Sequence, residues 1–491
     1  MGELFENMGF KENPFSRFSA EEEKEYLHNI FVPPKYYSTI HSDVKAGSSR
    51  FIFGERGVGK SALVLNLKSD FSGNQVFCIL IDDYEGIKLT SNGKEFLALT
   101  LKNVVTTFGL YLLKNKQYIR GLSKEEKEKL TLFINIFFET LSKSQFDDLY
   151  NQTTHIKSKN IFRRIINYFI FKPMNIFLSG CSEFIGSTIN NALGLPTQID
   201  EHVYKEFFPE LKETSFLEKI IPSELEYPTT KLMLKELVPI INKCGYNGVV
   251  IIYDKIDEYR LLNAQITTIA QFVKDLVLDT SLLLDDSISL VFSLWNRIKQ
   301  PLANMGVRFD KLKPIDITWT NNELKKILSD KLAYFSDKKI YDLQQIVSEK
   351  YVETILHLAN GSPRHLIILL SKIYDEQTTI DDSVKTFCDE AVEKGLANFA
   401  STFDFGIYYS GEKLDTMRKI VKEVLRVQKI EFQTKDLIDT FKISSQAANN
   451  KIRTMLSYGI IEDVTAGTRA KQYQVVEPRI EYLIKNNVRL S

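Results

Sequence analysis

Four short apolar runs, each the length of one β-strand, are spaced along the first part of the chain. They lie at 50–53, 75–81, 249–253 and 288–294, and segments with the apolar spacing of helices separate them. Runs in which successive residues are all apolar are typical of strands buried on both faces, as in a parallel sheet. The pattern therefore predicts an α/β core, with helices flanking a parallel sheet.

Helical spacing of Leu, Phe and Ile dominates the segments between these runs. Residues 96–114 and 125–148 are predicted helices, and several more follow before the third apolar run. A compact sheet domain does not need so much helix. We therefore expect a sheet domain over 51–318 that carries a helical insertion at about 115–235.

Three further segments are predicted around this domain. Residues 1–50 form an approach segment that leads into the first strand. Residues 319–400 are helical and open on a capping box at Thr320–Glu323, which predicts a helical lid. Residues 411–491 show three short helices followed by a β-hairpin, the order of a winged helix-turn-helix domain.

The stretch after the first apolar run has the pattern G-x-x-x-x-G-K-S, which is typical of a phosphate-binding loop, the P-loop. Its glycines let the backbone turn N–H groups toward phosphate oxygens, and the helix that follows presents its positive end to them. Lys60 is expected to reach the β- and γ-phosphates of ATP, and the Ser61 hydroxyl to bind Mg²⁺. The nucleotide-binding residues predicted here are Gly54, Glu55, Arg56, Gly57, Val58, Gly59, Lys60, Ser61 and Ala62.

A set of carboxylates follows the third predicted strand. Asp254 comes at the carboxyl end of this strand, where ligands bind in open α/β sheets, and is expected to hold Mg²⁺ together with Ser61. Asp257 and Glu258 lie one turn further on, and either could orient or deprotonate an attacking water. Together with the P-loop, these carboxylates predict hydrolysis of ATP to ADP and phosphate.

Other polar residues are candidates to face the γ-phosphate. Ser293, Asn296 and Arg297 lie at the end of the fourth predicted strand, and we favour Asn296 and Arg297 for this role. Arg364 follows Gly361-Ser-Pro on the first turn of a lid helix, from which its guanidinium can reach phosphates. The segment Arg308-Phe-Asp310 is either an arginine finger or an ordinary salt-bridged loop.

Two tyrosines precede the P-loop strand. A segment in this position can lie against the adenine, so Tyr36 and Tyr37 are candidate base contacts, with Tyr37 preferred. The alternative is that both are core or surface aromatic residues. The sequence does not decide between the two.

Composition narrows the class of protein further. Lys and Arg together number 63, as do Asp and Glu, so the chain has no overall basic character that would indicate nucleic-acid binding. The four cysteines are scattered and form no C-x-x-C pair, as in reduced intracellular proteins. No basic-then-apolar signal begins the chain, and charges interrupt its most apolar region at 161–189. We therefore expect a cytoplasmic protein without a membrane partner.

The chain resembles the P-loop ATPases of the additional-strand class, which include the AAA+ origin-recognition proteins and the STAND (NACHT-type) switch ATPases. Asp254-Lys-Ile-Asp257-Glu258 resembles the extended Walker B motif of STAND proteins, whereas AAA+ proteins place Glu directly after the first Asp. Gly361-Ser-Pro-Arg364 resembles the sensor 2 motif of origin-recognition ATPases. The opening at 9–16 is similar to a bacterial P-loop ATPase family that is often placed beside anti-phage defence genes.

This resemblance implies a nucleotide held between the P-loop domain and the lid. The first reading is a slow ATPase switch whose nucleotide state controls homo-oligomerisation or a partner effector protein, in anti-phage defence by the last similarity. The alternative is an initiator- or loader-type AAA+ ATPase that binds duplex DNA through 411–491. A third reading is a scaffold that binds nucleotide for structure and barely hydrolyses it.

The C-terminal segment leaves DNA and protein contact both open. Its third helix would place Gln446, Asn449, Asn450 and Arg453 in a major groove, with Arg469 and Lys471 on the wing. From residue 411 onward, 15 Lys and Arg stand against 10 Asp and Glu, a local charge of +5 that allows DNA contact. In many switch ATPases, however, this fold packs on the nucleotide domain as a protein module.

Overall fold

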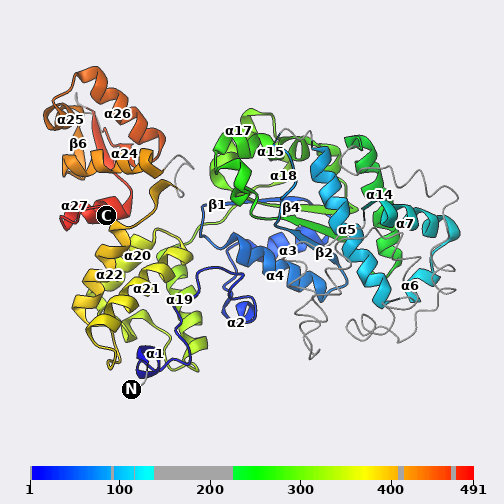
Figure 1. Ribbon diagram of the computed structural model, residues 1–491, viewed down its shortest axis with the longest axis horizontal. Coiled ribbons are helices and arrows are strands. Elements are labelled where there is room, and N and C mark those ends of the chain that lie inside the picture. Colours follow the sequence, from blue (N-terminus) through cyan, green and yellow to red (C-terminus); the bar gives the residue numbers. More distant parts are fainter. Residues whose placement is uncertain are drawn as a thin grey trace.

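The computed structural model describes residues 3–89, 93–115, 117–137, 225–406, 414–465 and 471–490. These residues form a sheet domain, a group of long helices and a small C-terminal unit (Figure 1). Most of the predicted insertion at 115–235 lies outside the described residues. The wing residue Arg469 also lies outside them.

A five-stranded parallel sheet forms the centre of the N-terminal half, as the sequence predicted. Its strands are β1 (Arg50–Gly54), β2 (Phe77–Ile81), β3 (Val249–Tyr253), β4 (Ile288–Trp295) and β5 (Ile315–Asp316). Their order is β2-β3-β4-β1-β5, with every pair parallel. Since β4 lies between β1 and β3, the strand that leads into the P-loop and the strand that precedes Asp254 are not neighbours.

The continuous apolar runs are explained by burial on both faces of this sheet. Along β1, Phe51 and Phe53 enter the large core on one face, and Ile52 enters a smaller core on the other. The residues of β3 alternate in the same way, and all five are buried. Helices on both sides therefore keep every position of β3 away from water until the strand ends.

Helices cover both faces (Figure 1). The smaller core takes residues from α3 and α4, and the larger core from the helices of the opposite face. The bounds are α3 (Tyr37–Lys45), α4 (Lys60–Ser72), α5 (Lys94–Lys114), α6 (Gln117–Arg120), α7 (Lys124–Phe137), α14 (Tyr227–Lys243), α15 (Ile266–Leu278), α16 (Thr280–Leu283), α17 (Lys299–Asn304) and α18 (Phe309–Leu312). No helix in the described ranges is both long and apolar enough to cross a bilayer.

A helical unit follows, which we call the lid. It comprises α19 (Asn321–Phe335), α20 (Glu349–Ala359), α21 (Pro363–Ile380) and α22 (Asp389–Ser401). The predicted capping box forms at its start, because the Thr320 hydroxyl accepts from the Glu323 N–H and the Glu323 carboxylate accepts from the Thr320 N–H. Unexpectedly, residues 4–30, with α1 (Leu4–Asn7) and α2 (Leu27–Ile30), pack into the core of this lid (Figure 1).

The C-terminal unit has its elements in the predicted order. These are α24 (Leu414–Val427), β6 (Glu431–Gln433), α25 (Thr434–Phe441), α26 (Ser445–Ser457), β7 (Ile461–Asp463) and β8 (Gln472–Val475). The sequence analysis missed β6, which pairs with β8 to make a three-stranded antiparallel sheet. It also missed the last helix, α27 (Pro478–Lys485), whose Ile480 packs in the C-terminal core while Tyr482 packs on the lid.

A buried ion pair lies at the junction that α27 makes with the lid. The side chains of Arg479 and Glu477 are both fully buried, and Arg479 Nη2 donates to Glu477 Oε2 over 2.8 Å. The same guanidinium lies 4.1 Å from the centre of the Phe403 ring and 3.3 Å from Nδ1 of His365 in α21. Arg479 therefore joins the C-terminal unit to the helix that carries Arg364.

We expect Arg479→Ala to destabilise this junction by about 3–5 kcal/mol, because the charge of Glu477 would stay buried without a partner. Urea unfolding followed by circular dichroism measures the loss. Lys485→Ala is the matched control on α27, since Lys485 pairs with Glu481 at the surface and exposed ion pairs contribute little. Equal effects of the two substitutions would contradict a structural role for the buried pair.

Candidate functional site

The P-loop lies between β1 and α4, at the carboxyl edge of the sheet. Gly57 and Gly59 have φ angles of +81° and +92°, a region that side chains other than glycine rarely adopt. A Cβ added at Gly57 would lie 2.6 Å from the Ser362 hydroxyl of the lid. Glycine at this position therefore serves both the turn of the loop and the close approach of the lid.

The residues predicted to hold phosphate and Mg²⁺ converge here. Lys60 Nζ donates to the carbonyls of Gly54 and Glu55, both over 3.0 Å. The Ser61 hydroxyl donates to Asp254 Oδ2 over 2.7 Å. Lys60, Ser61 and Asp254 line one pocket, so two segments far apart in the chain supply one site.

Burial dominates the electrostatics of this site. It raises the pKa of the Asp254 carboxyl, although the hydroxyls of Ser293 and Ser61 and the charge of Lys60 oppose that rise. Burial also lowers the pKa of Lys60, against the attraction of Asp257 and Asp254. A polyphosphate would offset the desolvation of Lys60 by supplying negative charge beside it.

The donor set suits Mg²⁺ bound with a nucleotide. Magnesium is commonly held by one or two carboxylates together with substrate phosphates and waters, rather than by a cage of protein ligands. Ser61 and Asp254 supply one hydroxyl and one carboxylate, and the described residues contain no group of three or more His, Cys, Asp or Glu placed to hold a metal. Ser61 and Asp254 therefore fit a magnesium ion that is bound together with a nucleotide.

The two candidate bases have different surroundings. Asp257 accepts from Arg56 Nε over 2.8 Å, and the Arg56 guanidinium lies 4.6 Å from the centre of the Trp295 ring. Glu258 lines the pocket, and no ion pair or hydrogen bond of its side chain occurs within the described residues. Burial raises the pKa of Glu258, and the negative charge of Asp257 adds to the rise. Glu258 is therefore the carboxylate with free capacity to accept a proton.

The residues at the end of β4 contact Glu55, a residue of the P-loop. Trp295 Nε1 donates to Glu55 Oε2 over 2.8 Å, and Arg297 Nε lies 3.5 Å from Glu55 Oε1. Neither Asn296 nor Arg297 is among the residues that line the pocket. The strand ends beside Glu55 and Arg297 pairs with it there, so the approach of these two residues to a γ-phosphate stays a prediction.

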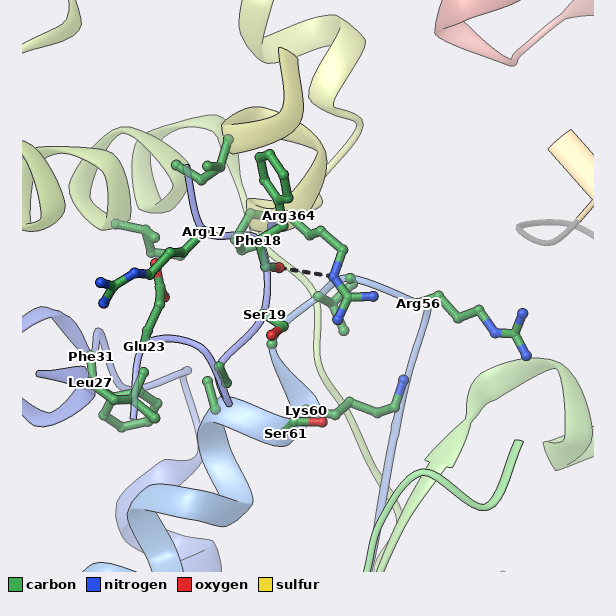
Figure 2. Close-up of a pocket in the computed structure, with 18 of the residues that line it drawn as sticks. Arg17, Phe18, Ser19, Glu23, Leu27, Phe31, Arg56, Lys60, Ser61 and Arg364 are labelled. Atoms are coloured by element: carbon green, nitrogen blue, oxygen red, sulfur yellow. Dashed lines mark hydrogen bonds between the residues drawn. The ribbon is translucent and has the colours of Figure 1, made fainter. Parts of the chain in front are cut away.

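The lid contacts the P-loop through three donors. The Ser362 hydroxyl and the Arg364 N–H both donate to the Gly57 carbonyl, over 3.2 and 3.3 Å. Trp319 Nε1 donates to the Val58 carbonyl over 2.7 Å. The Arg364 side chain lines the pocket as predicted from sequence, with Nε donating to the Phe18 carbonyl over 3.2 Å (Figure 2).

The rest of the pocket is built by residues before the P-loop strand, but not by the expected tyrosines. Tyr37 lies outside the pocket, where its hydroxyl donates to Asp70 on α4 over 2.6 Å. Tyr36 is also absent from the lining, and its side chain is exposed. Apolar residues of 17–34 line the pocket instead: Phe18, Leu27 and Phe31 are seen in Figure 2. Ile30 and Val32 also belong to the lining.

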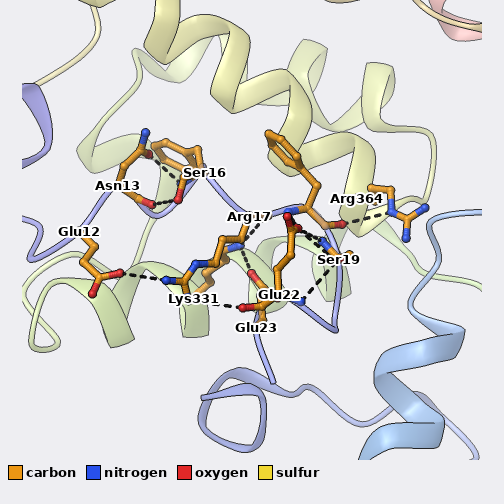
Figure 3. Close-up of polar contacts among 11 residues, drawn as sticks. Glu12, Asn13, Ser16, Arg17, Ser19, Glu22, Glu23, Lys331 and Arg364 are labelled. Atoms are coloured by element: carbon orange, nitrogen blue, oxygen red, sulfur yellow. Dashed lines mark hydrogen bonds and ion pairs between the residues drawn. The ribbon is translucent and has the colours of Figure 1, made fainter. Parts of the chain in front are cut away.

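Polar contacts fasten the segment 17–23 within itself and to the lid (Figure 3). The Glu22 carboxylate accepts from the N–H groups of Phe18 and Ser19, which closes the turn. Glu21 pairs over 2.9 Å with Lys255, the residue after Asp254, and Glu23 pairs with Lys331 on lid helix α19. The segment therefore links the lid to the strand that carries Asp254.

Arg308 is the residue for which the sequence left two alternatives, an arginine finger and an ordinary salt bridge. Its guanidinium pairs with Asp310 two residues away, over 2.7 Å, and both side chains are more than half exposed. Arg308 thus forms a surface ion pair with Asp310 at the start of α18, away from the pocket lining.

Comparisons with known proteins do not assign this chain to a family. A scan against protein-family models finds no match, and a search of curated proteins finds none either. A solved structure that matches is the ORC2 protein of Aeropyrum pernix in its ADP form, which is similar over 98% of each chain at 10% identity and a TM-score of 0.34. A likeness at that TM-score does not assign a function to this chain.

Proposed function

We propose that this chain is an ATP-binding and ATP-hydrolysing switch, whose nucleotide state controls self-association or a partner effector protein. The observation that supports it most is the convergence of Lys60, Ser61 and Asp254 in a pocket that the lid also lines. A role in anti-phage defence stays a prediction from sequence similarity alone.

The pocket residues divide the chemistry between them. Lys60 would exchange its two loop carbonyls for β- and γ-phosphate oxygens, and Arg364 would bind phosphate from the lid side. Mg²⁺, held by Ser61 and Asp254, would supply positive charge to the phosphates. Glu258 would accept a proton from the attacking water, while Arg56 keeps Asp257 in an ion pair.

The contacts of the lid suggest how nucleotide state would reach the rest of the molecule. Ser362 and Arg364 contact the P-loop, and His365, the next residue in α21, lies against Arg479 of α27. If nucleotide binding or hydrolysis shifted the start of α21, Arg479, which joins the C-terminal unit to this helix, would therefore move with it. These contacts support a switch in which the position of the C-terminal unit depends on which nucleotide occupies the pocket.

Lys60→Ala should abolish measurable binding of Mg-ATP, because it removes the cation that neutralises the β- and γ-phosphates. Isothermal titration calorimetry of the wild type and the variant measures the affinity. Lys68→Ala, on the same helix but outside the pocket lining, is the control for a loss of positive charge. Unchanged ATP affinity in Lys60→Ala would refute the assignment of the P-loop.

Glu258→Gln should lower the turnover of ATP by roughly 10²–10⁴-fold while ATP binding is retained, because a general base contributes about that much. Phosphate release under saturating ATP measures the rate. Asp257→Asn is the comparison, since its carboxylate already accepts from Arg56. If Asp257→Asn abolished turnover and Glu258→Gln did not, the two assignments would have to be exchanged.

Duplex DNA binding through the C-terminal unit is a second candidate, favoured by one surface. Helix α26 exposes Gln446, Asn450 and Arg453 on the same side, and Lys471 at the start of the wing strand is exposed as well. Arg453→Glu should then weaken duplex binding and reduce its salt dependence, which a fluorescence anisotropy titration at two salt concentrations measures. A change in oligomer size with ATP alone, and no DNA binding, would favour the switch instead.

A further inference from the structure

The part of the pocket remote from the phosphate loop is walled by apolar side chains. Figure 2 shows Lys60 and Ser61 on one side of the pocket, and Leu27, Phe31 and Glu23 on the other. Ile327 and Ile367 of the lid complete the lining. An aromatic base suits such walls, and a few polar groups among them would fix its orientation and identity.

One ion pair stands in this apolar surrounding. Lys331 of α19 pairs with Glu23, and their side chains retain only 5% and 13% of their exposure. Both residues line the pocket. Taking two charges out of water costs more than an ion pair usually returns, and two apolar side chains would hold the segment to the lid at least as well. The position of the pair in the pocket points to a role in recognition.

Each member of the pair has bonding capacity to spare. The Lys331 ammonium has three N–H groups, of which one is used by Glu23 and one by the Arg17 carbonyl at 3.3 Å. Lys331 bonds Oε1 of Glu23, while Oε2 makes no hydrogen bond or ion pair among the described residues. One donor and one acceptor therefore remain next to each other at the pocket.

We propose that Glu23 and Lys331 recognise the edge of a 6-aminopurine, so that the site selects adenine nucleotides; this rests on the proposed ATP-binding function. The carboxylate accepts from the exocyclic amine, and the ammonium donates to the ring nitrogen beside it. At this edge adenine presents one amine and one ring nitrogen, which need one acceptor and one donor. Glu23 and Lys331 have one of each that no other described residue uses. Guanine carries a carbonyl oxygen in place of the 6-amine and a protonated nitrogen beside it, so the carboxylate would face an acceptor and the ammonium a donor, both unpaired at a cost.

The test compares ATP with purine riboside triphosphate, which lacks the 6-amino group, and with GTP. Wild-type protein should bind ATP about 10- to 100-fold more tightly than either analogue, because a hydrogen bond to a charged group contributes about that much. The variant is Glu23→Met together with Lys331→Met, which leaves no buried charge without a partner and so preserves folding. It should bind all three nucleotides with similar affinity in a calorimetric titration with Mg²⁺.

Lys326→Met with Asp330→Met is the matched control, since this ion pair lies on the same helix, at the surface and outside the pocket lining. It should keep the wild-type preference. If the pair only fastens the segment to the lid, the Glu23 and Lys331 variant would weaken all three nucleotides by the same factor, and the proposal is overturned. A wild type that binds none of them would instead contradict the proposed function.

Discussion

The hydrogen bond between Ser61 and Asp254 is the contact on which the site depends. The two residues are 193 positions apart, and β4 separates the strands that precede them. Their approach requires all three strands to end at one edge, which the parallel register of β1, β4 and β3 provides. Apolar packing on both faces of the sheet fixes this register. Burial of the core therefore stabilises the arrangement in which the Ser61 hydroxyl lies beside the buried Asp254 carboxylate.

The second constraint is that the pocket is built by parts of the chain with separate cores. The P-loop and Asp254 belong to the sheet, whereas residues 4–30 pack with the lid. Contacts such as Lys255 with Glu21, and Gly57 with Ser362, cross between these units. A ligand in the pocket would touch both, so its binding energy can be used to set their relative position. This is the physical basis for a switch.

The strands and the phosphate loop could be predicted because their signals are local. A continuous apolar run that ends in Asp predicts a buried strand, and glycines at fixed spacing before Lys-Ser predict a P-loop. The partners of Arg56 and Arg297 could not be predicted, since they depend on which strands become neighbours. Residues 17–31 also lack a periodic pattern, so nothing in them indicated that they line the pocket, whereas Tyr37, the preferred candidate, lies outside the lining. The buried Arg479 is a similar case, because arginine in sequence usually indicates a surface.

If Ser61 and Asp254 hold a magnesium nucleotide together with Lys60, the affinity for ATP must depend on Mg²⁺ through the Ser61 hydroxyl. Calorimetry with and without Mg²⁺ should show that the ion tightens ATP binding to the wild type. In Ser61→Ala, where the hydroxyl is missing, most of that gain should disappear while metal-free binding stays the same. An equal gain from Mg²⁺ in both proteins would show that the ion is bound elsewhere, and would contradict the account.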